Sequence, residues 1–263
     1  MTRALQEFAT GLYVQTNVIH ALILRETKTR FGKYQLGYLW ALLEPIMWMS
    51  LFFLMFLFGG RVAPNGMDFV GFMATGMCPF LLFRQTTNQL TRAVSGNKAL
   101  LFYPQVFPLD LLIARGTLEA ASISVVFLLI MGGNAVFGAG TAPAHPVHVI
   151  TGFAMASLLG AALGTTLHAA TLYFPSVENY MSSVLRLMFW VSGIFFTSTE
   201  LPTQAAALLW WNPALHIVEI VRSGWYGAYH PTIADPGYVL YWMLGFGFIG
   251  LTLERISRRR IEL

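Results

Sequence analysis

Long apolar stretches alternate along the chain with short polar stretches that are rich in turn-forming residues. In residues 36–58, for example, Glu44 is the one charged residue among 23. At 1.5 Å per residue, a helix of that length covers the roughly 30 Å hydrocarbon thickness of a bilayer. The same pattern predicts an all-α integral membrane protein with six transmembrane helices, at residues 36–58, 69–92, 109–137, 147–172, 180–197 and 237–253.

Two regions depart from this pattern. In residues 4–24 the apolar positions fall on one stripe of a helix, which predicts a helix that lies in the membrane surface or packs against a partner. Residues 198–236 contain two apolar pieces, 205–211 and 215–221, which are too short to span and are separated by an Asn-Pro pair. Short apolar helices broken by proline and flanked by Trp and Tyr favour a re-entrant or interfacial hairpin at the outer leaflet.

The basic residues gather on one side of the predicted spans. The chain has 16 Lys and Arg, 56% hydrophobic residues and 11% charged residues, so it has too little polar surface for a water-soluble globule. Thirteen basic residues fall on segments assigned to the same side: residues 3, 25, 28, 30, 33, 84, 92, 98, 186, 255, 258, 259 and 260. The positive-inside rule then predicts cytoplasmic N- and C-termini. Because these charges flank apolar spans, we expect no nucleic acid partner.

Several polar residues lie within the predicted spans or the hairpin. Arg115 and Glu119, one helical turn apart, form a self-neutralised pair or a polar patch on a transport path. His216, Glu219 and Arg222 recur every three residues. They line an aqueous exit, or a Glu219–Arg222 pair ties the hairpin together.

Two further features concern contacts between helices. Ala156, Gly160, Gly164 and His168 are spaced by four, which predicts a small-residue ridge for close helix packing with an interior histidine. Glu44 is expected to need a partner or a wet cavity at membrane depth.

The motifs of common enzymes are absent. The sequence contains no GxxxxGK[ST] phosphate loop, no HExxH, no paired-cysteine motif and no GxSxG elbow. We therefore expect no catalytic residue, no metal site and no cofactor in this chain. Broken helices, together with a proline-containing loop at residues 95–110 on the basic side, favour a transport subunit driven by another protein.

Three strings carry a family resemblance. They are TRFGKYQLGYLWALLEP at 29–45, SGIFFTSTELP at 192–202 and NPALHIVEIVRSGWY at 212–226, followed by an arginine-rich tail. In this order they resemble permease subunits of type 2 ABC exporters, specifically the capsular polysaccharide export family, over essentially the whole chain. The middle string is shared more loosely with O-antigen and teichoic acid exporters.

The resemblance implies a homodimer in the bacterial inner membrane that moves lipid-linked capsular polysaccharide from cytoplasm to periplasm. ATP and Mg²⁺ would bind a separate cytosolic ATPase subunit, and a periplasmic adaptor and an outer-membrane exporter would complete the assembly. Residues 4–33 correspond to the family's gate helix, 97–108 to its coupling helix and 200–229 to its periplasmic re-entrant helices. The alternatives are an O-antigen or teichoic acid permease, or a membrane enzyme acting on lipid-linked sugars.

Candidate site residues follow from this cargo, because sugar rings bind flat aromatic faces and hydrogen-bonding groups. The candidate substrate path comprises Arg25, Lys28, Arg30, Lys33, Tyr34, Tyr38, Trp40, Glu44, Trp48, Arg115, Glu119, Trp210, Trp211, His216, Glu219, Arg222, Trp225 and Tyr226. The aromatic members fit an interfacial belt equally well, and the basic members bind an anionic headgroup or only set topology. The candidate coupling residues are Asn97, Lys98, Leu101, Phe102, Tyr103, Pro104, Phe107 and Pro108.

Overall fold

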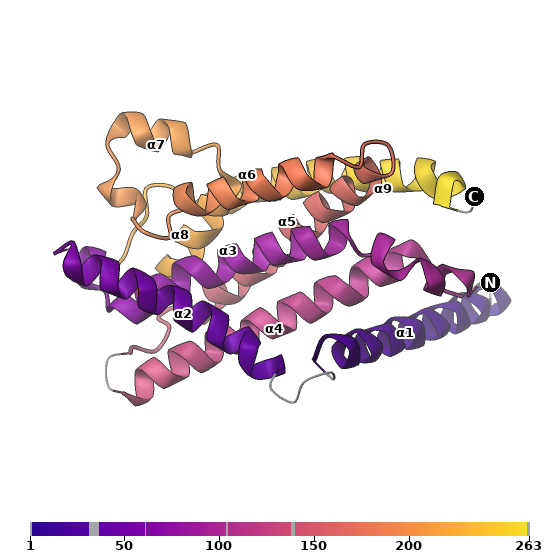
Figure 1. The fold of residues 1–263 in the computed structure, drawn as a ribbon, viewed down its shortest axis with the longest axis horizontal. Coiled ribbons are helices and arrows are strands. Elements are labelled where there is room, and N and C mark those ends of the chain that lie inside the picture. Colours follow the sequence, from indigo (N-terminus) through magenta and orange to yellow (C-terminus); the bar gives the residue numbers. More distant parts are fainter. Residues whose placement is uncertain (1, 32–36, 61, 104, 138–139, 262–263) are drawn as a thin grey trace.

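Helices make up most of the chain. The computed structural model describes residues 2–31, 37–60, 62–103, 105–137 and 140–261 (Figure 1). This described part contains no strand, which confirms the all-α class. Its α-helices are α1 (Thr2–Phe31), α2 (Gly37–Phe58), α3 (Phe69–Thr91), α4 (Pro108–Val136), α5 (Pro146–Thr171), α6 (Val177–Val191), α7 (Thr203–Leu209), α8 (Pro213–Trp225) and α9 (Pro236–Ile261). Three 3-10 helices join them: η1 (Pro64–Gly66), η2 (Ser95–Phe102) and η3 (Ser198–Glu200).

The helices differ in how well they suit a bilayer. Within the described residues, three stretches are long and apolar enough to cross a membrane: Pro108–Val136, Pro146–Thr171 and Pro236–Ile256. In α2 the described apolar stretch is Pro45–Phe58, and the sequence of the helix before it is also apolar apart from Glu44. Helix α3 is less apolar because it lies at the centre of the bundle, in contact with α4, α5 and α8, and needs no lipid-facing side. These helices fit an integral membrane protein.

The helix bounds follow the predicted spans closely except at two places. Helix α6 ends at Val191, whereas the span was predicted to continue to residue 197. The chain turns at Gly193, whose φ of +74° is outside the helical region, and the backbone that follows faces α8. Helix α9 continues to Ile261, beyond the predicted end of its span at residue 253. Its arginine-rich end is therefore an extension of the same helix.

The bundle has two distinct ends (Figure 1). One end carries the first residues of α1, the last of α9 and η2, and is called the terminal face. The other carries residues 62–68, 140–145 and 198–235, and is called the distal face. Helix α1 lies beside the part of α4 nearest the terminal face, and α7 stands away from the bundle at the distal face.

Glycines on α5 bring its backbone against α3. A Cβ built at Gly160 would lie 2.7 Å from the Phe83 carbonyl oxygen, and one built at Gly164 would lie 2.9 Å from the Thr87 carbonyl oxygen. The Thr87 hydroxyl also lies 3.3 Å from the Gly160 carbonyl oxygen and donates to it. The small residues therefore form the close helix–helix contact that their spacing predicts.

We expect Gly164→Ala to lower stability by about 1–3 kcal/mol, because the added methyl overlaps backbone that has no room to move. The matched control is Gly132→Ala on α4, where a built Cβ meets nothing within 4 Å. That control should be neutral or slightly stabilising, since alanine favours helix. Thermal unfolding of the detergent-solubilised protein measures both, and equal midpoints would contradict the prediction.

Candidate functional site

Helix α1 is joined by polar contacts to the segment that connects α3 with α4. The Arg25 guanidinium donates to Asn97 Oδ1 over 2.9 Å. The Gln15 amide donates to the carboxylate of Asp110, in the first turn of α4. Asn97 is 7% exposed and also donates to the Ala93 carbonyl oxygen at 3.0 Å. The segment between Asn97 and Asp110 is thus held to α1 at both ends.

A third contact joins α1 to α4 itself. Arg115 Nε lies 2.9 Å from Glu26 Oε1, and the two side chains are 15% and 19% exposed. The Arg115 guanidinium also donates to the Gln89 carbonyl oxygen of α3 at 3.2 Å. A cavity of about 270 Å³ lies at this junction, and Glu119 is one of its lining residues. The ion pair therefore joins α4 to α1. The sequence interpretation had instead paired Arg115 with Glu119 on the same helix.

The segment held in this way presents aromatic side chains to the outside. Phe102, Tyr103 and Phe107 are 88%, 63% and 45% exposed. Leu101 and Pro108 are half-buried against the bundle. Apolar side chains exposed between two anchored ends form a surface suited to a partner protein.

We expect Glu26→Lys to weaken the contact between α1 and α4, because it places two cations in one partly buried site. The detergent-solubilised variant should therefore unfold at a lower midpoint temperature than the wild type. The double variant Glu26→Lys/Arg115→Glu restores opposite charges and should recover part of the lost stability. If the double variant is no more stable than the single one, the ion pair does not stabilise this contact.

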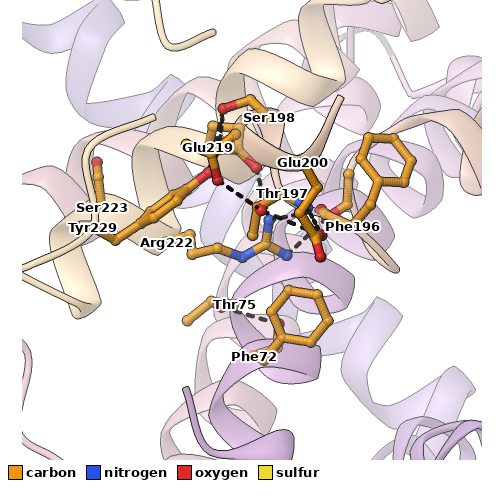
Figure 2. A network of polar contacts seen from close by, with 12 residues as sticks. Phe72, Thr75, Phe196, Thr197, Ser198, Glu200, Glu219, Arg222, Ser223 and Tyr229 are labelled. Atoms are coloured by element: carbon orange, nitrogen blue, oxygen red, sulfur yellow. Dashed lines mark hydrogen bonds and ion pairs between the residues drawn. The ribbon is translucent and has the colours of Figure 1, made fainter. Parts of the chain in front are cut away.

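At the distal face Glu219 and Arg222 lie at the centre of a network of polar contacts (Figure 2). Arg222 Nη1 donates to Glu219 Oε1 at 2.7 Å, and both side chains are 0% exposed. The guanidinium also donates to the carbonyl oxygens of Gly193 at 2.7 Å and Phe196 at 3.3 Å, and lies 4.5 Å from the centre of the Phe72 ring. One arginine thereby links α8, the end of α6 and the central helix α3.

The second carboxylate oxygen of Glu219 is also satisfied. Ser198 donates to it at 2.9 Å, and the Tyr229 hydroxyl donates to the same oxygen. Burial, and then the negative charge of Glu219, raise the pKa of Tyr229 above its usual value, so the phenol keeps its proton and remains a donor. The sequence predicted the Glu219–Arg222 pair, and the structure places both residues on α8. Their other partners fix α8 to residues 193–198 and to Tyr229, so the network acts as a tie between these segments.

His216 is held in one neutral tautomer. Its Nε2 lies 2.8 Å from the Trp210 carbonyl oxygen, which accepts only, and its Nδ1 lies 3.0 Å from the Asp235 backbone N–H, which donates only. The proton therefore resides on Nε2. With no exposed surface, His216 joins α7, α8 and the start of α9 and does not face an open path.

Asp68 was not among the sequence candidates, yet it organises the distal face. It caps α3 through the Gly71 N–H at 2.7 Å, accepts from Asn134 at 2.6 Å and accepts from the Tyr226 hydroxyl at 2.7 Å. The sequence signal was present, since an aspartate precedes an apolar helical run and is a preferred N-cap. Its long-range partners had no such signal.

The other candidates fall into three groups. Lys28, Trp48, Trp210 and Trp211 are exposed, whereas Trp225 is buried. Lys33, Tyr34 and Pro104 lie outside the described residues. The helices containing the remaining five are described but their side chains are not: Arg30, Tyr38, Trp40, Glu44 and Lys98.

Comparison with known proteins assigns the family. The family model for the ABC-2 type transporter matches residues 17–226. The chain belongs to the ABC-2 type transporter family. This confirms the resemblance read from the sequence strings and places the chain among transporter membrane subunits rather than enzymes.

The relatives of this ABC-2 chain carry related names. It is similar to the polysialic acid transport protein KpsM of Escherichia coli, with 31% identity over 94% of this chain and 95% of the relative. It is also similar to the capsule polysaccharide export inner-membrane proteins CtrC of Neisseria meningitidis (28% identity; 97% and 96% covered) and BexB of Haemophilus influenzae (27%; 97% and 96%). The O-antigen export permease RfbA of Klebsiella pneumoniae is 25% identical over 74% of each chain.

Proposed function

We propose that this chain is the membrane subunit of an ATP-driven exporter that moves lipid-linked capsular polysaccharide out of the cytoplasm. The observation that carries the proposal is similarity along nearly the full length to two capsule polysaccharide export proteins and to a polysialic acid transport protein. The O-antigen permease matches over only three quarters of the length. The geometry supports it, because an anchored aromatic surface at the terminal face suits a separate ATPase.

In this proposal the chain forms a homodimer in the bacterial inner membrane, with six crossings per subunit and both termini in the cytoplasm. ATP and Mg²⁺ bind the partner ATPase, which docks on the coupling segment at residues 97–108. The substrate path comprises the aromatic and charged candidates that are not enclosed in the hairpin tie, and residues 200–229 form periplasmic re-entrant helices. A periplasmic adaptor and an outer-membrane exporter receive the polymer.

The coupling role rests on the three polar contacts of α1. A force on the aromatic surface reaches α1 through Asn97 and Asp110, because a hydrogen bond to Arg25 or Gln15 joins each of them to that helix. Glu26 and Arg115 carry the same motion to α4. Such contacts give the ATPase a direct mechanical route to the helix that would gate the cytosolic opening.

Deletion of the gene in the bacterium that carries it tests the proposal. We expect polysaccharide to accumulate inside the cell and to disappear from the surface, and the wild-type gene to restore it. A normal surface polymer in the deletion strain would overturn the function. A stable protein that purifies without an ATPase and shows glycosyl transfer would favour the membrane enzyme instead.

A further inference from the structure

The distal face contains a cavity lined by two of the substrate-path candidates, Trp225 and Tyr226. Its volume is about 720 Å³, and it is open to the outside. It lies where four separate segments meet: the loop around η1, the α4–α5 connection, η3, and the α8–α9 connection. Cavities of about 300–1,000 Å³ hold organic ligands of several rings, so this one is far larger than an ion site needs.

The aromatic wall of the cavity is fixed before any ligand arrives. Tyr226 and Tyr229 line it, but their hydroxyl groups are already committed to Asp68 and Glu219. They therefore offer ring surface and not a hydroxyl donor. Trp225, the third aromatic lining residue, packs edge-on against Phe127 with ring centres 5.5 Å apart. Rings held in this way lose little conformational entropy when a ligand binds.

The polar lining consists of amide, hydroxyl and imidazole side chains and is accessible. Asn65, Thr141, Thr199 and His230 all line the cavity and are exposed. The Asn65 amide donates to the Thr199 hydroxyl over a long 3.4 Å, and that hydroxyl also lies 3.0 Å from the Thr197 hydroxyl. The Asn65 amide therefore keeps a further N–H and its carbonyl oxygen for a ligand. None of the described lining residues is Asp, Glu, Lys or Arg. The buried Trp225 indole N–H, moreover, has no hydrogen-bond partner within the described residues.

Rigid aromatic rings beside amide, hydroxyl and imidazole groups match the chemistry of a sugar ring, which has one apolar face and a rim of hydroxyl groups. A lipid chain would require a uniformly apolar wall. A strongly charged ligand would require an opposite charge. We propose that this cavity binds a short segment of the exported carbohydrate chain at the distal face. The inference rests on the proposed function, which it deepens by naming a binding site.

Cysteine accessibility tests the occupant directly. Ala228 lines the cavity and is exposed, whereas Val147, at the start of α5, is 71% exposed and is not a described lining residue. A228C and V147C are compared in intact cells that carry the whole transporter, with a membrane-impermeant maleimide as the probe. The native Cys78 is buried and gives the background. Each variant is labelled while polymer is exported and again when polymer synthesis is disabled.

We expect A228C to label roughly tenfold more slowly during export than when polymer synthesis is disabled, which is the protection given by about 90% occupancy. V147C should label equally in both states. Equal labelling of A228C in both states would overturn the proposal. Protection that persists without polymer but disappears when the periplasmic partner proteins are deleted would assign the cavity to a protein and would also overturn it.

Filling the cavity provides an independent measurement. Ala142→Leu/Ala228→Leu adds bulk without an aromatic face or a hydrogen-bonding group, and Val147→Leu is the control. We expect roughly tenfold less surface polymer for the filled variant, equivalent to about 1.4 kcal/mol of lost binding, and normal export for the control. If the wild-type gene itself fails to restore surface polymer, the proposed function fails. If it restores surface polymer and the filled variant does so equally well, the cavity proposal alone fails.

Discussion

Arg222→Met is expected to destabilise the protein more than any other single change considered. It leaves the Glu219 carboxylate, with no exposed surface, without its cation, and removes the donor to the Gly193 and Phe196 carbonyl oxygens. Removing one partner of a buried ion pair typically costs about 3–5 kcal/mol. Thermal unfolding in detergent should show a large drop in midpoint, and the amount of protein in the membrane should fall.

An exposed ion pair provides the matched control. Arg92 and Glu178 lie 2.6 Å apart, but their side chains are 56% and 34% exposed. Arg92→Met should therefore cost no more than about 1 kcal/mol. Similar losses of stability for the two variants would contradict the role assigned to the buried tie.

A second variant separates charge from packing. Glu219→Gln/Arg222→Met removes both charges, while the amide oxygen still accepts from Ser198 and Tyr229. This pair should be more stable than Arg222→Met alone by more than about 1 kcal/mol, because an unpaired buried charge is the larger penalty. A double variant as unstable as the single one would show that lost backbone contacts dominate.

Phe102→Asp should separate the chain from the ATPase subunit that the proposed function requires. Phe102 is 88% exposed on a segment anchored at Asn97 and Asp110, so it is positioned to insert into a partner. Aromatic anchors at protein interfaces often contribute 2 kcal/mol or more, which corresponds to roughly 30-fold in affinity. Co-purification of the ATPase and its membrane-dependent ATP hydrolysis should both be lost.

The control variant adds the same carboxylate but leaves the Phe102 ring in place. Gln105 is exposed in the same segment, and Gln105→Asp adds an identical carboxylate without removing apolar surface. It should retain the ATPase. If Phe102→Asp and Gln105→Asp behave alike, charge and not the aromatic contact decides docking.

Local patterns predicted the helices well, because apolar runs and their breaks act over neighbouring residues. The small-residue ridge at Gly160 and Gly164 packs against α3 as its spacing predicts. The predicted end of the fifth span differs from the end of α6. Residues 192–197 are apolar enough to continue a helix, which is why the prediction included them. The chain turns there at Gly193, and the carbonyl oxygens that follow serve as acceptors for a distant arginine.

The sequence identified residues that need a polar partner more reliably than it identified the partner itself. Arg115 was recognised as a charge in need of neutralisation, and the structure pairs it with Glu26 from another helix. Asp68 escaped notice because its importance comes from Asn134 and Tyr226, which are 66 and 158 residues away along the chain.

Apolar length and motif order, which are properties of consecutive residues, were enough to predict an all-helical membrane protein, and the ABC-2 family match agrees with the predicted class. Long-range contacts set which charges meet, which aromatic rings are enclosed and where the distal cavity lies. A buried charge or donor pairs with whichever group folding brings within hydrogen-bond distance, and the separation of two residues along the sequence does not predict their distance in the fold.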